Sequence, residues 1–290
     1  MSNLTKGGRE LVSKIIVGKD LKDSIKKAVN LIGGFAKVIE KGDTVIVKPN
    51  FNTNDTFPGS SDPSFVKCVI ELLYDAGAKK VILAESSCFH TNSRKMMSSI
   101  IPIAQKAGAE VVIVDEINDW HAVEVNGKNM KKLNVARIYS EKPKKTKFVW
   151  LPCMKTHKQA RFTLSLKLPM GMLKGTDRMK MHVLGLQARI ADLNLAVVPP
   201  DLIIMDGRKC FITGGPCKGN VRKPSLIMAS GDRIALDVEA VKVIQEFKGN
   251  SLEIRNPWDF IQIKTAVANK IGKVRDEDDY VVVYSDTLEK

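Results

Sequence analysis

Residues 44–50 read Thr-Val-Ile-Val-Lys-Pro-Asn, a short apolar run that ends in a lysine and a proline. The run predicts a buried strand at 44–47, because its residues favour extended backbone and Pro49 cannot donate to a sheet ladder. Asp62 and Pro63 then predict the start of a helix, since aspartate caps helix N-termini and proline fits the first turn. A buried strand followed by a helix is typical of a parallel sheet with crossover helices.

The same alternation continues on both sides of this stretch. Apolar runs that predict strands and amphipathic segments that predict helices follow each other, with turn residues between them. The predicted strands are 14–17, 44–47, 81–84, 111–114, 148–151, 202–205, 226–229 and 281–284, and the predicted helices are 21–31, 93–107, 186–195, 232–247 and 258–271, besides the one that begins at Asp62. We therefore predict an α/β fold in which a mostly parallel sheet has helices on both faces.

Residues 120–182 are less regular. Glycine and methionine are frequent in the second half of this segment, and we predict mostly loop over 155–178, with a short helix at 162–168. No repeat, low-complexity stretch or linker divides the chain. The sequence predicts a single α/β domain over residues 1–290, with a loop-rich, irregular insertion around 120–182.

The composition is that of a globular protein, since 44% of the 290 residues are hydrophobic and 27% are charged. The longest apolar runs are far shorter than the ~20 residues of a membrane-spanning helix. Residues 1–10 are polar and lack the apolar core of a signal peptide. We therefore expect a cytoplasmic protein with no membrane partner. The formal net charge of +14 favours anionic partners, although the lysines are spread along the whole chain.

Cysteine usage points to reduced thiols. The chain has five cysteines, Cys68, Cys88, Cys153, Cys210 and Cys217. Their number is odd, they are widely spaced, and no export signal accompanies them. Zinc and iron–sulfur motifs space their ligands more closely than any of these. We expect buried free cysteines and no iron–sulfur cluster.

Polar residues follow several predicted strands. Ligands of open α/β sheets bind beyond the carboxyl ends of the strands, so these residues are candidates to bind a small anion. The ligand-binding candidates at strand ends and in the polar middle segment are Lys48, Asn50, Glu85, Ser86, Lys167, Lys174, Asp206 and Gly207. Lys48, fixed between a strand and a proline, needs an anion or a carboxylate nearby. A purely structural pair with Glu85 or Asp206 is the alternative.

Acid–base residues gather after the predicted strand at 148–151. Lys155 and His157 follow it closely, His182 lies in the same polar middle segment, and we predict these three as catalytic. Neighbouring lysines should lower the pKa of His157, because positive charge disfavours the imidazolium. A neutral imidazole can accept a proton or bind a metal. The candidates to bind a divalent metal, if the cofactor is one, are Glu85, Asp206 and His157.

The glycine-rich segments lack the fingerprints of two common nucleotide sites. Residues 171–175 read Gly-Met-Leu-Lys-Gly and residues 214–216 read Gly-Gly-Pro. Neither has the spacing of a Rossmann motif or the Lys-Ser/Thr pair of a P-loop. We expect neither a standard nicotinamide site nor NTP hydrolysis by a Walker motif.

A set of short motifs occurs in one order along the chain. They are Val47-Lys48-Pro49-Asn50, Lys155-Thr156-His157, Leu166-Lys167 with the glycines of 171–175, Ile190-Ala191-Asp192-Leu193-Asn194, Pro200-Asp201-Leu202 with Asp206-Gly207, Gly215-Pro216, and Gly231-Asp232 with Ala235 and Asp237. This order resembles the domain of unknown function family 362, over about residues 44–245. The resemblance implies a prokaryotic α/β protein and supplies no reaction. Some relatives carry a ferredoxin-like segment with four close cysteines, and this chain has no such segment.

Several functions stay open at this point. The first is an enzyme that acts on a small carboxylate or phosphate by lysine and histidine acid–base chemistry, with or without a metal. The second is a nucleic-acid-binding protein that uses the +14 charge, which is weakly supported. The third is a redox or metal-handling protein with Cys153, Cys210, Cys217 and His157 as ligands or thiols, and the fourth is a ligand sensor without catalysis.

Overall fold

The computed structural model describes residues 4–87, 92–183, 185–253 and 255–285. Its strands are β1 (Thr5–Lys6), β2 (Arg9–Ile16), β3 (Thr44–Pro49), β4 (Lys80–Glu85), β5 (Glu110–Ile113), β6 (Trp120–Glu124), β7 (Lys132–Ala136), β8 (Thr146–Leu151), β9 (Cys153–His157), β10 (Arg161–Thr163), β11 (Leu202–Gly214), β12 (Gly219–Arg222), β13 (Leu226–Ser230) and β14 (Tyr280–Tyr284). Its helices are α1 (Leu21–Asn30), α2 (Pro63–Asp75), α3 (Ser93–Met96), α4 (Ile101–Lys106), α5 (Val114–Ile117), α6 (Arg137–Ser140), α7 (Gly175–Val183), α8 (Leu186–Ala196), α9 (Arg233–Gln245) and α10 (Ile261–Ala268). The 3-10 turns are η1 (Phe35–Lys37), η2 (Leu168–Met172), η3 (Pro257–Asp259) and η4 (Glu277–Asp279).

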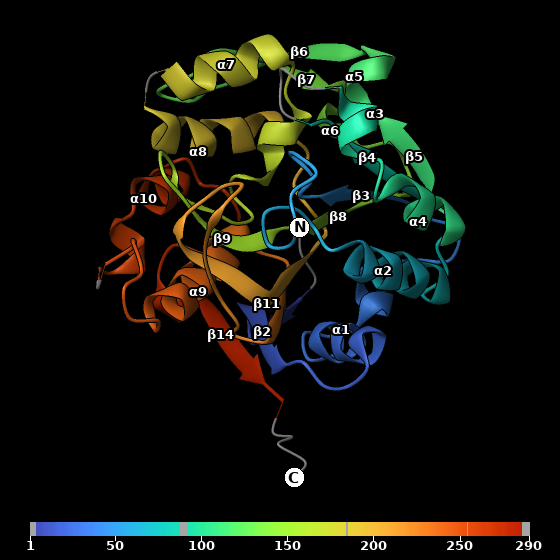
Figure 1. Cartoon of the computed structure of the whole chain (residues 1–290), viewed down its shortest axis with the longest axis horizontal. Helices are drawn as coiled ribbons and strands as arrows, with labels where there is room; N and C mark the ends of the chain where they lie inside the picture. The colour runs from blue at the N-terminus through green and yellow to red at the C-terminus, as the bar shows by residue number, and fades with distance from the viewer. Residues whose placement is uncertain (1–3, 88–91, 184, 254, 286–290) are drawn as a thin grey trace.

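One large sheet organises these elements, in the order β1-β2-β13-β11-β8-β3-β4-β5. Strands β11, β8, β3, β4 and β5 are parallel, whereas β13 runs antiparallel to both β11 and β2. Strand β9 continues beside β11, and β10 pairs with β9. The predicted α/β fold with a mostly parallel sheet is confirmed. Strands β6 and β7 form a separate hairpin at the top of Figure 1.

The sheet is covered on both faces. Residues of β3 alternate between the two sides, so that Val45 and Val47 pack with α1, α2 and α4 while Ile46 packs in the cluster that contains α8, α9 and α10. In Figure 1, α1 and α2 lie on one side of the sheet and α9 and α10 on the other. This layering follows from strands that are apolar on both faces. It leaves the strand ends as the open edge for polar residues.

The helix after β3 begins as its sequence predicts. The Asp62 carboxylate accepts a hydrogen bond from the Ser64 N–H at 2.8 Å, and Pro63 occupies the first turn. The residues between β3 and α2 form a loop, closed where the Ser61 N–H donates to the Asn50 carbonyl at 2.8 Å and the Asn50 N–H donates to Ser61 Oγ at 2.9 Å. This loop lies directly above the strand ends and becomes one wall of the candidate site.

Three predicted helices differ from the structure. The helix at 162–168 is wrong, because β10 pairs with β9 up to Thr163 and the 3-10 turn η2 begins only at Leu168. The helix at 93–107 is split into α3 and α4, with Pro102 in the first turn of α4. The helix at 258–271 is split into η3 and α10. Segment 155–178 also contains more regular structure than predicted, because β9, β10, η2 and α7 occupy much of it.

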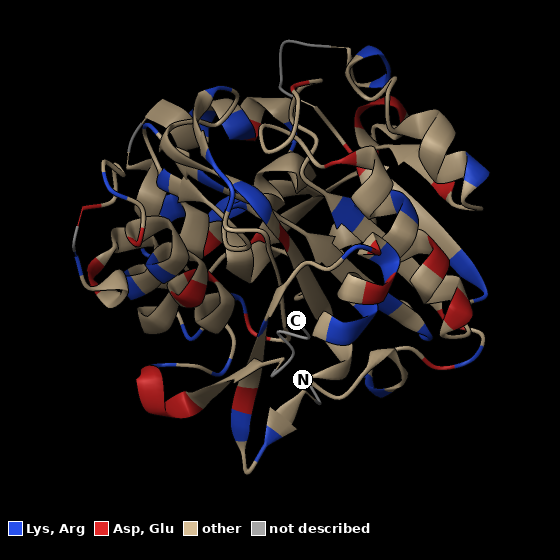
Figure 2. Ribbon diagram, turned by 60° about the horizontal axis from the view of Figure 1, so that its bottom comes forward, with Lys and Arg blue, Asp and Glu red and all other residues tan. Residues whose placement is uncertain are grey.

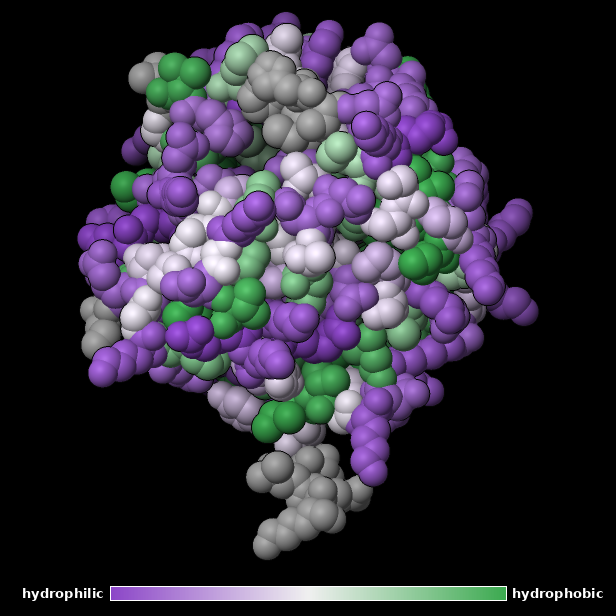
Figure 3. Space-filling model, viewed as in Figure 1, coloured by the Kyte–Doolittle hydropathy of each residue, from purple (hydrophilic) through white to green (hydrophobic). Residues whose placement is uncertain are grey.

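The surface mixes charges and apolar residues. Figure 2 shows lysine and arginine spread over helices and loops, with aspartate and glutamate between them. Figure 3 shows hydrophilic residues over most of the visible face and apolar residues in scattered groups. In the ranges that the structure describes, no helix has the length and apolar character needed to cross a membrane. The cytoplasmic location stays a prediction.

Candidate functional site

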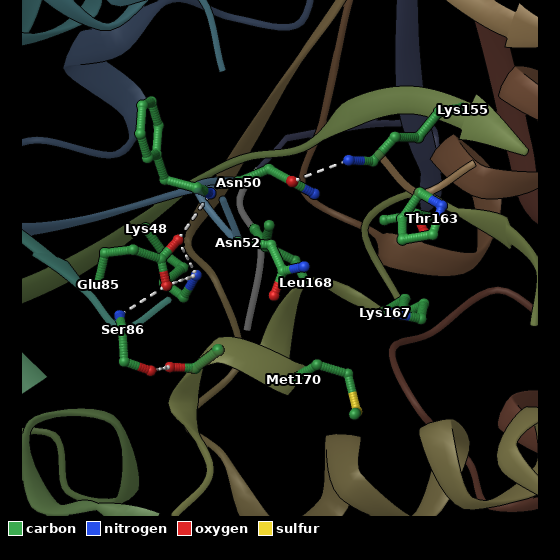
Figure 4. Close-up of a pocket in the computed structure, with 13 residues that line it drawn as sticks. Lys48, Asn50, Asn52, Glu85, Ser86, Lys155, Thr163, Lys167, Leu168 and Met170 are labelled. Atoms are coloured by element: carbon green, nitrogen blue, oxygen red, sulfur yellow. Dashed lines mark hydrogen bonds and ion pairs between the residues drawn. The ribbon is translucent and has the colours of Figure 1, made fainter. Parts of the chain in front are cut away.

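A small cavity of about 50 Å³ lies at the carboxyl ends of β3 and β4, against the β9–β10 pair (Figure 4). Six of the residues predicted from the sequence line it: Lys48, Asn50, Glu85, Ser86, Lys155 and Lys167. A volume of this size holds a few water molecules or one compact polar group. The cavity therefore has room for a compact group only.

Lys48 and Glu85 form a buried ion pair at the floor of the cavity, and each is 1% exposed. Lys48 Nζ lies 2.7 Å from both carboxylate oxygens and donates to the Pro49 carbonyl at 2.8 Å. The carboxylate also accepts the N–H groups of Phe51 at 2.9 Å and Ser86 at 2.8 Å. Burial pushes the pKa of Lys48 down and that of Glu85 up, and each charge opposes the shift of the other. Because Glu85 meets only donors, we take the pair as ionised.

The turn η2 closes over this pair. A Cβ atom on Gly171 would lie 2.5 Å from Glu85 Oε1 and 2.8 Å from Lys48 Nζ, so no side chain fits there. Ser86 Oγ donates to the Gly171 carbonyl at 2.6 Å, and Arg178 on α7 in turn donates to Ser86 Oγ. The end of β4, the turn and α7 are thereby joined around one wall of the cavity.

The segment that carries Lys167 is hydrogen-bonded to helices α8 and α9. The Asp237 carboxylate of α9 accepts the Ser165 N–H at 2.8 Å and the Leu166 N–H at 2.9 Å. Asn194 of α8 donates to the Leu166 carbonyl at 2.7 Å. Burial raises the pKa of Asp237 to about 7. Asn194 and Asp237 belong to the sequence motifs but received no predicted role, and their role here is to position a loop of the site.

Lys155 lies on the opposite wall and is 1% exposed. Its ammonium or amine nitrogen donates to Asn50 Oδ1 at 3.2 Å and to the Gly59 carbonyl. Both partners are neutral oxygens, and burial lowers the pKa of Lys155. A Cβ on Gly59 would meet Asp55 and the Cys217 carbonyl at 2.8 Å, so glycine lets this backbone approach closely.

Thr163 was missed by the sequence reasoning. It faces Lys155 across the β9–β10 pair, lines the cavity and is 4% exposed. Its Oγ1 atom is buried and has no hydrogen-bond partner in the described part of the chain. A buried hydroxyl without a partner is costly, which marks it as a group that a ligand can satisfy. The wrong helix at 162–168 hid this side chain, because β pairing is what places it opposite Lys155.

His157 has the lowered pKa that the sequence predicts. Burial is the main cause, followed by the charges of Lys167, His182 and Lys155, and together they lower its pKa to about 2. The Nδ1 atom accepts the N–H groups of Gln159 at 3.2 Å and Ala160 at 3.1 Å. The proton of the neutral ring therefore resides on Nε2. This arrangement favours a hydrogen-bond donor over the base or metal ligand that we expected.

His157 lies outside the cavity, in a separate hollow lined also by Arg161 and Ser251, and the remaining predicted residues lie outside the cavity too. His182 Nδ1 is 2.7 Å from the Arg178 carbonyl, beside a separate hollow at the start of α8, yet close enough to act on the pKa of His157. Lys174 is exposed. Asp206 pairs with Arg208 at 2.7 Å, and Gly207 packs against Met154. Asp206 and Gly207 were placed at a strand end, but β11 continues to Gly214 and keeps them inside the sheet.

Metal and thiol chemistry receive no geometric support from the described ranges. No three histidine, cysteine, aspartate or glutamate side chains in those ranges gather to hold a metal. Glu85, Asp206 and His157 belong to separate hydrogen-bond groups. Cys68, Cys153, Cys210 and Cys217 are free thiols, and burial raises the pKa of Cys153 and Cys210 to about 12. Cys88 lies outside the described residues.

Comparison with known proteins places the chain in a family. The model of the family described as a domain of unknown function, DUF362, matches residues 45–242. A thylakoid-associated protein of Synechocystis sp. is 26% identical over 231 residues, which are 77% of this chain and 69% of that protein. A crystal structure of a Thermotoga maritima protein aligns with a TM-score of 0.46 and 11% identity, over 78% of this chain and 56% of that one. The chain therefore belongs to the DUF362 family, whose motifs its sequence resembles.

Proposed function

We propose that the cavity binds the carboxylate or phosphate of a small substrate, and that the protein is an enzyme that transfers a proton through Lys155. The observation that carries the proposal is the pairing of Lys155 with Thr163. A lysine whose hydrogen-bond partners are neutral and a hydroxyl without a partner are cross-strand neighbours, and both line one buried cavity. An oxyanion bound by Thr163 and Lys167 would satisfy the hydroxyl and would lie beside the lysine.

The balance of charge around the cavity supports an anion. Lys48 is neutralised by Glu85, so this pair adds dipoles and little net charge. Lys167 lines the same cavity, and its positive charge is strong enough to lower the pKa of His157. A buried cationic site excludes cations and favours oxyanions, which accept several donors at once.

His157 would contribute by holding the turn between β9 and β10, because it lines a neighbouring hollow and not the cavity itself. Its Nδ1 atom accepts the Gln159 and Ala160 N–H groups of that turn, and its lowered pKa keeps the ring neutral near neutral pH. The proton acceptor in the site would be Lys155, since burial lowers its pKa towards the range in which an amine can take up a proton.

The test uses two threonines that differ in position. Thr163 and Thr156 both carry a buried hydroxyl without a partner in the described structure, but Thr163 lines the cavity and Thr156 does not. Valine has nearly the same shape as threonine, so Thr163→Val and Thr156→Val should each leave stability unchanged or raise it. Only Thr163→Val should weaken binding of inorganic phosphate or succinate, by about tenfold, as measured by calorimetry.

Two outcomes would contradict the proposed anion site. Wild-type protein that binds neither phosphate nor succinate contradicts the proposal, as does an equal loss of affinity in the two valine variants. Lys209→Met removes an exposed lysine on β11 and shows how much of any binding comes from general surface charge. It should change the affinity little at physiological salt.

A further inference from the structure

The two buried lysines of the cavity differ in how many acceptors surround them. Lys48 Nζ has three oxygen atoms at hydrogen-bond distance, two from Glu85 and one from Pro49. Lys155 Nζ has two, Asn50 Oδ1 and the Gly59 carbonyl. An ammonium group carries three N–H donors, whereas a neutral amine carries two donors and one lone pair. The surroundings of Lys48 match an ammonium, and those of Lys155 match an amine.

Charged groups near Lys155 affect whether its nitrogen is an ammonium or a neutral amine. Negative charge on Asp55, Cys153 or Cys217 would favour the ammonium, while Lys48 and Lys167 are the other basic side chains that line the cavity. The burial of Lys155 outweighs the groups that favour charge, and lowers its pKa. A buried amine with a lone pair is a nucleophile, and desolvation together with cationic neighbours is how proteins activate lysine.

We propose that Lys155 forms an imine with the carbonyl carbon of a small 2-oxo acid, whose carboxylate is bound by Lys167 and Thr163. This inference rests on the anion site proposed above and names its substrate class. A 2-oxo acid places a carbonyl next to a carboxylate, and the cavity places an amine next to oxyanion donors. The small volume suits the two functional groups, and Leu168 and Met170 line the cavity where a short apolar tail would lie.

The step balances without any further reactant. The Lys155 nitrogen attacks the carbonyl carbon and a C–N bond forms, while the π electrons of the carbonyl move to its oxygen. The two hydrogens of the amine then leave with that oxygen as water, and a C=N bond remains. Protonation of the imine nitrogen gives an iminium that withdraws electrons from the neighbouring carbon.

The experiment traps this iminium. Full-length protein is incubated with pyruvate and reduced with sodium borohydride, and the modified residue is mapped by peptide mass spectrometry. We expect the peptide with Lys155 to gain the mass of pyruvate less one oxygen atom. Acetone, which lacks the carboxylate, should label Lys155 far less, and Lys155→Arg should abolish the adduct. Phosphate should protect Lys155, whereas Lys158, exposed three residues further along the chain, should react weakly and without protection.

Asn50→Asp tests the lone-pair argument itself. The substitution keeps the acceptor beside Lys155 but gives it a negative charge, which favours the ammonium and should raise the pKa of Lys155 by about one to three units. The pH dependence of trapping should move upward by a similar amount. A profile that stays in place contradicts the assignment of Lys155 as an amine.

The two proposals fail in different ways. Labelling confined to exposed lysines, with phosphate binding intact and still sensitive to Thr163→Val, overturns the imine and leaves the anion site. If wild-type protein shows neither labelling of Lys155 nor binding of phosphate, the proposed function is overturned as well.

Discussion

The substitution Glu85→Gln removes one charge of the buried pair and leaves the other. Lys48 would then be a buried ammonium without a counter-charge, at 1% exposure. The new amide also mismatches its surroundings, because its NH₂ must replace one carboxylate oxygen. One of those oxygens accepts the Phe51 N–H and the other accepts the Ser86 N–H, so two donors would face each other.

The expected loss is large for a single isosteric change. Breaking a buried ion pair by removing one partner costs about 3–5 kcal/mol, and a donor–donor contact belongs within that range. Most of this cost is the unpaired charge of Lys48. The double variant Lys48→Met with Glu85→Gln should therefore recover at least about 2 kcal/mol of the loss.

Urea unfolding followed by circular dichroism measures both values at neutral pH. The exposed pair of Arg94 and Glu116 supplies the matched control, and Glu116→Gln should change stability little because water screens that pair. A Glu85→Gln protein within about 1 kcal/mol of the wild type, or a double variant less stable than the single one, would refute the reasoning. Either result would mean that the pair is not ionised in the folded protein.

Three further outcomes follow from the site. Gly171→Ala should lower stability by about 1–3 kcal/mol in urea and weaken phosphate binding, because its Cβ would collide with Glu85 and Lys48. Asp237, whose folded pKa is about 7 against about 3.9 unfolded, should make stability fall as pH rises from about 4 to 7, and Asp237→Asn should lose that slope. His157, whose pKa is about 2, should stay neutral by NMR below its ordinary value of about 6.5, and His157→Gln should lessen the loss of stability as pH falls from there. An Asp237→Asn protein that keeps the full slope, or a His157 ring that titrates normally, contradicts the corresponding assignment.

The residues found from sequence share one property. Lys48 and Glu85 lie in the last residues of β3 and β4, and Asn50 and Ser86 come directly after those strands, so the strand-end rule located them. Asp206 fails the same rule because β11 continues past its apolar run, with Arg208 to satisfy the carboxylate. An apolar run shows which residues are buried. The length of a strand, however, depends on how far the neighbouring strands continue to pair with it.

The sequence could not decide whether Lys48 pairs with Glu85 or with Asp206, for a related reason. Strand order is a property of the whole sheet, and it is β3 lying next to β4 in parallel register that brings Lys48 and Glu85 together. The role of Thr163 could not be predicted from the sequence for the same reason. Its role depends on β10 pairing with β9, and the local apolar spacing alone was compatible with a helix.

The strand β2 has a consequence for how the protein is made. Its residues pair with β13, more than two hundred positions later, and with β14 at Tyr280–Tyr284. During synthesis β2 must therefore remain without β13 and β14 until residues 226–284 have left the ribosome. Contacts of such long sequence separation slow folding, and an exposed apolar strand invites aggregation in the meantime. The β3–β4–β5 unit with α2 can assemble earlier, so the wall of the cavity that holds Lys48 and Glu85 can form well before β2 is enclosed.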